Sequence, residues 1–168
     1  MIEKRKVKVL IVDDSPLFRT TLEKFISEDQ HIEVIGKAGD AYEARDMILE
    51  LHPDVMTLDV EMPKMNGIDF LKRLMPQYPL PVVVVSSMAM TTFDALEAGA
   101  VDYVKKPLLK TSADMQGFFM ELRTKIIIAS TARIITRSAV KTPTAVESLS
   151  EIAGRKHADT IIALGAST

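Results

Sequence analysis

Five short runs of apolar, mostly β-branched residues recur along the first two thirds of the chain, and they constrain its fold most strongly. The runs are VKVLIV (7–12), IEVIGKA (32–38), DVMTLDV (54–60), PVVVVSS (81–87) and VDYVKKP (101–107). Runs of this length are typical of buried strands in a parallel sheet. Because helical patterns separate them, the sequence predicts an α/β fold: a five-stranded, doubly wound parallel sheet with helices on both faces.

A segment with helical periodicity follows each run, and two of these segments begin with a clear capping residue. The expected helices cover residues 15–29, 40–51, 68–75, 91–99 and a long stretch from Thr111 or Ser112 to about 133. Ser15 suits an N-cap because Pro16 follows it at the first helical position. Asp40 suits the N-cap of the second helix because its side-chain oxygens can accept hydrogen bonds from the backbone amides of the first turn.

The last predicted helix carries two apolar stripes. The stripe expected to pack on the sheet consists of Met115, Phe118, Phe119, Leu122, Ile126 and Ala129. The second stripe consists of Ile127, Ile128, Ile134 and Ile135. Either the second stripe widens the buried face or it covers another surface, and in the latter case we expect the chain to self-associate.

Composition excludes several classes of function. With 21 basic and 23 acidic residues, the chain lacks the positive charge of a nucleic-acid-binding protein. It has no cysteine, so disulfides and cysteine-ligated zinc are excluded. The apolar run near the N-terminus is too short for a signal peptide, and no run is long enough to cross a membrane. We therefore expect a cytoplasmic protein with no nucleic-acid partner and no membrane insertion.

The amino-acid composition of the chain changes after the last predicted helix. The stretch TRSAVKTPTAVESLSEIAGRKH (136–157) is rich in Ser, Thr and small residues and indicates a linker. The stretch HADTIIALGAST (157–168) then predicts a strand and a tight turn. The expected parts are a domain over 1–133, a linker over 134–158, and the first strand of a truncated second α/β domain over 159–168.

Polar residues follow the predicted strands at the edge where the carboxyl ends of parallel strands meet. Asp13 and Asp14 follow the first run, Asp59 ends the third, Ser86 the fourth, and Lys106 the fifth. Carboxylates this close repel one another unless a cation joins them, and Mg²⁺ is a hard cation that accepts carboxylates and keeps waters. Such a site suits a phosphoryl group, with the lysine and serine as its partners and a carboxylate as the nucleophile.

The stretches VLIVDDS, DVMTLDVEMPKMNGIDFL, PVVVVSS and GAVDYVKKP resemble, in order and spacing, the receiver domain of two-component response regulators. The resemblance implies a flavodoxin-like fold and a phosphoryl group donated to Asp59 by a sensor histidine kinase. The other residues that it implies are Asp13, Asp14, Asp59 and the backbone carbonyl of Glu61 as Mg²⁺ ligands, Ser86 as the switch hydroxyl, Tyr103 as the switch aromatic, and Lys106 as the phosphate-pairing lysine. Between Ser87 and Gly99 the chain is a few residues shorter than this family's pattern, so we expect a shortened fourth helix and loop.

The ending IIALGAST matches the first positions of a G-x-S-x-G nucleophile elbow. Together with the receiver and linker, it resembles the chemotaxis protein-glutamate methylesterases, in which a receiver regulates a serine hydrolase. The resemblance implies that Ser167 is the nucleophile and that methylated chemoreceptors are the substrates, with glutamine deamidation in some members. Because the triad's acid and base would come from later sequence, we expect this chain to be inactive as an esterase. His31, His52 and His157 are expected to be surface residues.

Three other functions are compatible with parts of the pattern. A haloacid dehalogenase-type phosphatase also uses an Asp nucleophile and Mg²⁺. Such an enzyme requires a second Asp as general acid two residues after the nucleophile, where this chain has Glu61. A stand-alone receiver, acting as a phosphate sink or an interaction module, stays open. So does a receiver with another effector, although residues 134–168 show no paired helical pattern of a DNA-binding domain.

Overall fold

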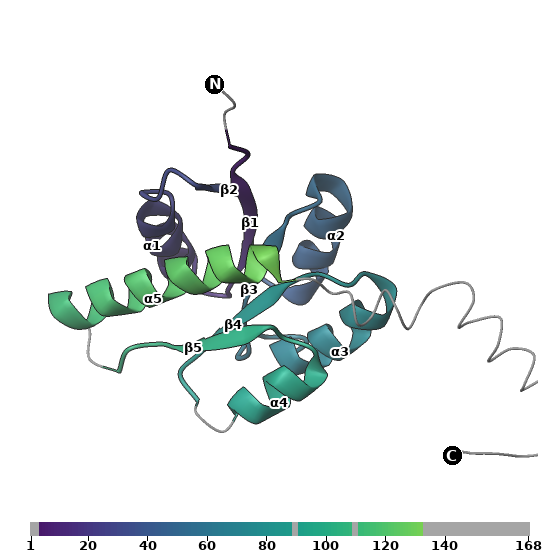
Figure 1. The fold of residues 1–168 in the computed structure, drawn as a ribbon. Helices are drawn as coiled ribbons and strands as arrows, with labels where there is room; N and C mark the ends of the chain where they lie inside the picture. Colours follow the sequence, from purple (N-terminus) through teal and green to yellow (C-terminus); the bar gives the residue numbers. More distant parts are fainter. Residues whose placement is uncertain (1–3, 89–90, 109–110, 133–168) are drawn as a thin grey trace, which may run out of the picture. The chain divides into compact units, whose positions relative to one another are not determined.

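Strands and helices alternate along the chain in the predicted order (Figure 1). The computed structural model describes residues 4–88, 91–108 and 111–132, which belong to one compact unit. Its elements are β1 (Val7–Val12), α1 (Pro16–Ile26), β2 (Ile32–Ala38), α2 (Ala41–Leu51), β3 (Val55–Asp59), α3 (Gly67–Gln77), β4 (Val82–Ser86), α4 (Thr91–Ala98), β5 (Asp102–Lys105) and α5 (Ser112–Thr131). The predicted fold class is thereby confirmed, while the predicted linker and second-domain strand lie outside the described residues.

The strands form one parallel sheet in the order β2-β1-β3-β4-β5. Its register pairs Val12 with Leu58, and Asp59 with Val85. Ser86 pairs with Lys105 at the end of β5. This register brings the carboxyl ends of β1, β3, β4 and β5 to one edge, which is where the polar residues were predicted to gather.

The helix starts follow from the capping residues. The Ser15 hydroxyl accepts a hydrogen bond from the Phe18 amide at 3.2 Å, and Asp40 caps α2 through two amides of its first turn. Thr111, rather than Ser112, caps α5, because its hydroxyl accepts from the Asp114 amide at 3.2 Å. Two boundaries differ from the prediction: α1 ends earlier, at Ile26, and α3 extends through a proline to Gln77. A proline in the last turn of α3 costs one backbone donor only, so the helix can continue past it.

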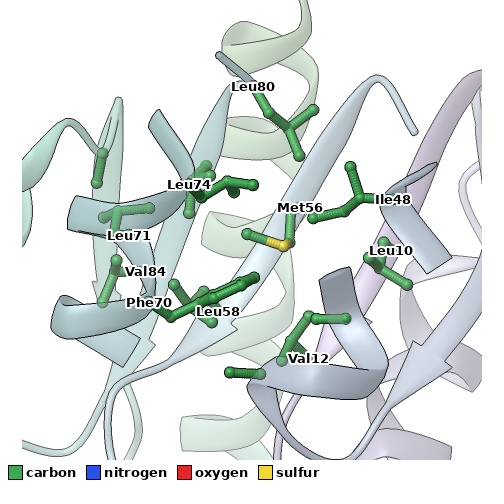
Figure 2. Packing of buried hydrophobic residues seen from close by; sticks show 14 of the residues in the cluster. Leu10, Val12, Ile48, Met56, Leu58, Phe70, Leu71, Leu74, Leu80 and Val84 are labelled. Atoms are coloured by element: carbon green, nitrogen blue, oxygen red, sulfur yellow. The ribbon is translucent and has the colours of Figure 1, made fainter. Parts of the chain in front are cut away.

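Helices lie on both faces of the sheet (Figure 1), and a hydrophobic cluster fills the space under them on each face. Under α2 and α3, Met56 and Leu58 of β3 meet Ile48, Phe70 and Leu74 of the helices (Figure 2). Under α1 and α5, the cluster includes Leu22, Ile26, Phe118, Phe119, Leu122 and Ile126. Because helices cover both faces, β3 and β4 are buried along their whole length, as their continuous apolar runs indicated.

The two apolar stripes of α5 have different outcomes. The first stripe is buried from Phe118 to Ala129, with Met115 partly buried against the same cluster. Ile127 of the second stripe also packs partly against this cluster, so it widens the buried face, whereas Ile128 is 56% exposed. Ile134 and Ile135 lie outside the described residues. Self-association of the chain therefore stays a prediction.

The remaining sequence expectations concern surface and length. His31 and His52 are exposed, as predicted, and His157 lies outside the described residues. Among the described helices α4 is the shortest, with eight residues, and it begins five positions after Ser86. In the part of the chain that the structure describes, no helix is long and apolar enough to cross a membrane.

Candidate functional site

Three charged side chains meet at the carboxyl edge of the sheet. Asp13 follows β1 and is 1% exposed, and Asp59 ends β3 and is 2% exposed. The Lys106 ammonium, just after β5, lies 2.9 Å from Asp13 Oδ2 and 3.5 Å from Asp59 Oδ2. Two buried carboxylates and one ammonium leave a net negative charge in a site of low solvent access.

Local backbone contacts fix the two buried carboxylates. Asp13 Oδ1 accepts a hydrogen bond from the Ser15 amide at 2.9 Å. Asp59 Oδ1 accepts from the Glu61 amide at 3.1 Å. In each case the loop that leaves the strand turns back onto its own carboxylate, so the oxygens are held in place before any ligand binds.

Burial, the negative charge of Asp13 and, to a smaller extent, that of Asp14 raise the pKa of Asp59, which comes to about 7. Lys106 and the Glu61 amide act in the opposite direction, because both favour the ionised carboxylate. A carboxyl group with a pKa this high is sensitive to any added positive charge. Perturbed groups of this kind are enriched at functional sites.

Lys106 is shifted in the direction that keeps it charged. Burial alone would lower its pKa, but the hydrogen bond and charge of Asp13, together with the charge of Asp59, raise the pKa above its usual value. The lysine is therefore a fixed cation rather than a proton donor.

The acidic cluster has the donor atoms of a hard-cation site. One carboxylate oxygen each of Asp13, Asp14 and Asp59 lies within 4.8 Å of the others, and Asp14 is exposed to solvent. An all-oxygen donor set suits Mg²⁺, which binds through one or two carboxylates and keeps several waters. The repulsion that raises the pKa of Asp59 is the electrostatic reason for a cation to fit here.

The two residues predicted as switches lie on β4 and β5. Ser86, at the end of β4, is fully buried, and its hydroxyl accepts a hydrogen bond from the Met88 amide at 3.1 Å. Tyr103 on β5 packs partly buried against the cluster under α2, α3 and α4. The Lys125 ammonium of α5 binds the Tyr103 carbonyl at 2.8 Å and lies 5.9 Å from the centre of its ring.

Three residues shape the site without having been predicted as part of it. A Cβ atom on Gly67 would lie 2.4 Å from the Asp59 carbonyl oxygen, so only glycine fits there. The Arg19 guanidinium donates to the Asp13 carbonyl at 2.6 Å, and Phe18 presents its ring to Lys106 at 4.5 Å. Neither Arg19 nor Phe18 carries a signal that the sequence alone separates from ordinary helix residues.

Comparison with known proteins places these features in context. The family model for the response regulator receiver domain matches residues 9–114. Among solved structures, the chain is similar to the response regulator domain of Thermotoga maritima CheB, with 40% identity and a TM-score of 0.70, over 77% of this chain and 99% of that one. It is also similar to a chain in the CheX-CheY-BeF3-Mg complex from Borrelia burgdorferi, with 30% identity and a TM-score of 0.57, over 70% of this chain and 90% of that one.

Curated relatives match nearly the whole chain. A protein-glutamate methylesterase/protein-glutamine glutaminase from Syntrophomonas wolfei is 54% identical over 98% of this chain and 47% of its own length. One from Vibrio vulnificus is 48% identical over 98% of this chain and 48% of its own length. The chain therefore spans about half the length of the curated relatives it matches.

Proposed function

Because the chain belongs to the response regulator receiver family, we propose that it is a phosphorylation-controlled switch in which Asp59 accepts a phosphoryl group from a sensor histidine kinase. The observation that carries this proposal is the buried Asp59 carboxylate, which lies near a second carboxylate and 3.5 Å from the Lys106 ammonium. A carboxylate in that setting is shielded from water but remains paired with a fixed positive charge.

The proposed step is nucleophilic. A carboxylate oxygen of Asp59 attacks the phosphorus of the donor's phosphohistidine, the P–N bond breaks, and the leaving imidazole takes a proton. An acyl phosphate forms on Asp59. The Lys106 ammonium then forms an ion pair with the phosphoryl oxygens, and Ser86 donates a hydrogen bond to them.

Asp13, Asp14, Asp59 and the backbone carbonyl of Glu61 would hold Mg²⁺. When bound, Mg²⁺ supplies a positive charge that favours the ionised carboxylate and offsets the roughly −1.5 to −2 charges that a phosphoryl group brings. The cluster geometry and the raised pKa of Asp59 support this assignment, as does the magnesium of the similar CheX-CheY-BeF3-Mg complex from Borrelia burgdorferi.

Labelling by a small phosphodonor tests the proposal. With acetyl phosphate and Mg²⁺, intact-mass measurement should show one phosphoryl group on the wild-type chain, none on Asp59→Asn, and none after EDTA. Asp54→Asn is the matched control, because Asp54 precedes the same strand at its opposite end and binds Arg5 and the Lys8 amide there. Labelling of Asp59→Asn equal to that of the wild type would contradict the proposal.

We further propose that the receiver controls a methylesterase and glutaminase activity toward chemoreceptors. We place this activity in the cytoplasm, where ATP is available to the kinase. The support is the naming of the relatives that match 98% of this chain and the IIALGAST motif, in which Ser167 would be the nucleophile. In the full-length gene product, Ser167→Ala should abolish methanol release from methylated receptors while Asp59 still labels. Asp59→Ala should retain basal hydrolysis and lose its stimulation by phosphodonors. Methanol release by Ser167→Ala would overturn the assignment.

A further inference from the structure

The Lys106 ammonium has a third neighbour besides the two aspartates. Its Nζ lies over the ring of Phe18, 4.5 Å from the ring centroid, while Asp13 and Asp59 lie at 2.9 and 3.5 Å. An ammonium has three N–H donors, and its side chain here is only 20% exposed. Two carboxylates and one aromatic face therefore surround a cation from which most water is excluded.

Phe18 is held under the lysine by other rings. Its centroid lies 6.0 Å from that of Phe118 on α5, and Phe118 meets Phe119 edge-on at 5.1 Å. Phe119 in turn stacks on Phe25 of α1 at 4.3 Å. This aromatic row, Phe18–Phe118–Phe119–Phe25, ties α1 to α5 and fixes the ring on which the ammonium lies.

We infer that Phe18 is a positioning residue for phosphoryl transfer to Asp59, acting through Lys106. The inference rests on the proposed function of Asp59. The negative face of a benzene ring attracts a cation most strongly where water is excluded. A long lysine side chain otherwise samples many rotamers, so the ring keeps its charge at the place where the phosphoryl oxygens arrive.

Leucine and tyrosine substitutions separate the ring's charge distribution from its bulk. Phe18→Leu keeps an apolar side chain but removes the aromatic face, and the maximal rate of labelling by acetyl phosphate should fall about three- to tenfold, which corresponds to about 0.7–1.4 kcal/mol. Phe18→Tyr keeps the aromatic face and should restore the rate. Phe70→Leu, which removes a buried ring from the cluster on the opposite face of the sheet, should lower stability without changing the rate at a temperature where all variants are folded.

Two further measurements distinguish positioning from packing. Site-specific 3,4,5-trifluorophenylalanine at position 18 keeps the ring's shape but weakens its negative face, so its rate should fall as in Phe18→Leu. In a Lys106→Met background, Phe18→Leu should leave the residual rate unchanged. A wild-type rate for Phe18→Leu or for the fluorinated chain, or an equal loss in the Lys106→Met background, would overturn the inference. An unlabelled wild-type chain would instead refute the role of Asp59.

Discussion

The two faces of the sheet carry different chemistry. Under α2, α3 and α4 the cluster is mainly aliphatic, with Phe70 as its buried phenylalanine. Under α1 and α5 lie the aromatic row and the buried hydroxyl of Thr57. Among the described residues, the ring–ring contacts all belong to this second side. The side that supports the charged residues thus adds a row of aromatic rings to its aliphatic core.

The strand alternation assigns the polar residues to these faces. Side chains two apart share a face, so Asp13 continues from Ile11, Asp59 from Thr57 and Lys106 from Val104, all toward α1 and α5. Ser86 and Tyr103 fall on the opposite face, and Tyr103 packs against the aliphatic cluster. Under the proposed function, the charged residues around the phosphoryl group thus lie on one side of the sheet, whereas Ser86, which donates to the phosphoryl oxygens, and Tyr103 lie on the other.

Damage to each core tests whether only one face supports the site. Phe119→Ala, under α5, should cost about 3–5 kcal/mol of unfolding free energy, and Leu71→Ala, under α3, about 2–5 kcal/mol, because each leaves a cavity in a fully buried position. Urea unfolding measures both losses. At a temperature where both variants are folded, only Phe119→Ala should slow labelling of Asp59. Equal slowing by Leu71→Ala would show that the two faces do not differ in this respect.

The glycine under the site gives the next largest effect. Gly67→Ala places a methyl group 2.4 Å from the Asp59 carbonyl oxygen and 2.9 Å from Val60 Cα, both backbone atoms that cannot rotate away. The chain should lose about 1–3 kcal/mol of stability. Gly117 is the matched control, because it lies on the exposed face of α5 and a methyl group there would have no neighbour within 4 Å.

Gly117→Ala should raise the unfolding free energy by about 0.5–1 kcal/mol, since alanine favours a helix interior. Thermal unfolding of the two variants should therefore shift in opposite directions. A Gly67→Ala protein as stable as the wild type would mean that the loop after β3 can move, and the fixed position of Asp59 would then need another explanation.

The sequence predicted the strands and the gathering of charge for a physical reason. Parallel strands must end at one edge, so Asp13, Asp59 and Lys106 had to meet once their strands were recognised. The close packing of Phe18 on Lys106 could not be foreseen. It depends on the distance and angle between α1 and α5, which neither the 3.6-residue periodicity nor the capping residues determine. The exposure of Ile128 beside the partly buried Ile127 depends on the same helix placement.

The raised pKa of Asp59 makes stability depend on pH. Because the pKa is about 7 in the folded chain and near its ordinary acidic value when unfolded, the folded state holds the proton more tightly. Without Mg²⁺, this contribution is complete below about pH 4 and is lost as pH rises to about 7, with a slope of at most ~1.4 kcal/mol per pH unit.

Asp59→Asn cannot titrate, so its stability relative to the wild type should increase from pH 4 to pH 7 and then level off. Asp13→Asn removes the charge that raises the Asp59 pKa and should lower that pKa, as followed by carboxyl-carbon NMR. A stability difference between Asp59→Asn and wild type that is the same at pH 4.5 and pH 7.5 would contradict the raised pKa.

Substitutions of Thr57 should have the smallest effect on stability. They test whether a polar side chain is needed inside the cluster under α1 and α5. Its hydroxyl is buried and has no hydrogen-bond partner among the described residues, and its register neighbours are Ile11 and Val83. Thr57→Val replaces the hydroxyl by a methyl group of similar size, so urea unfolding should show a gain of about 1 kcal/mol. Thr57→Ser, which keeps the hydroxyl and removes the methyl, should lose about 0.8 kcal/mol. Unchanged labelling of Asp59 in Thr57→Val would mean that only the polar residues at the strand ends of this face are needed for phosphoryl transfer. Slower labelling would mean that the buried Thr57 hydroxyl is needed as well.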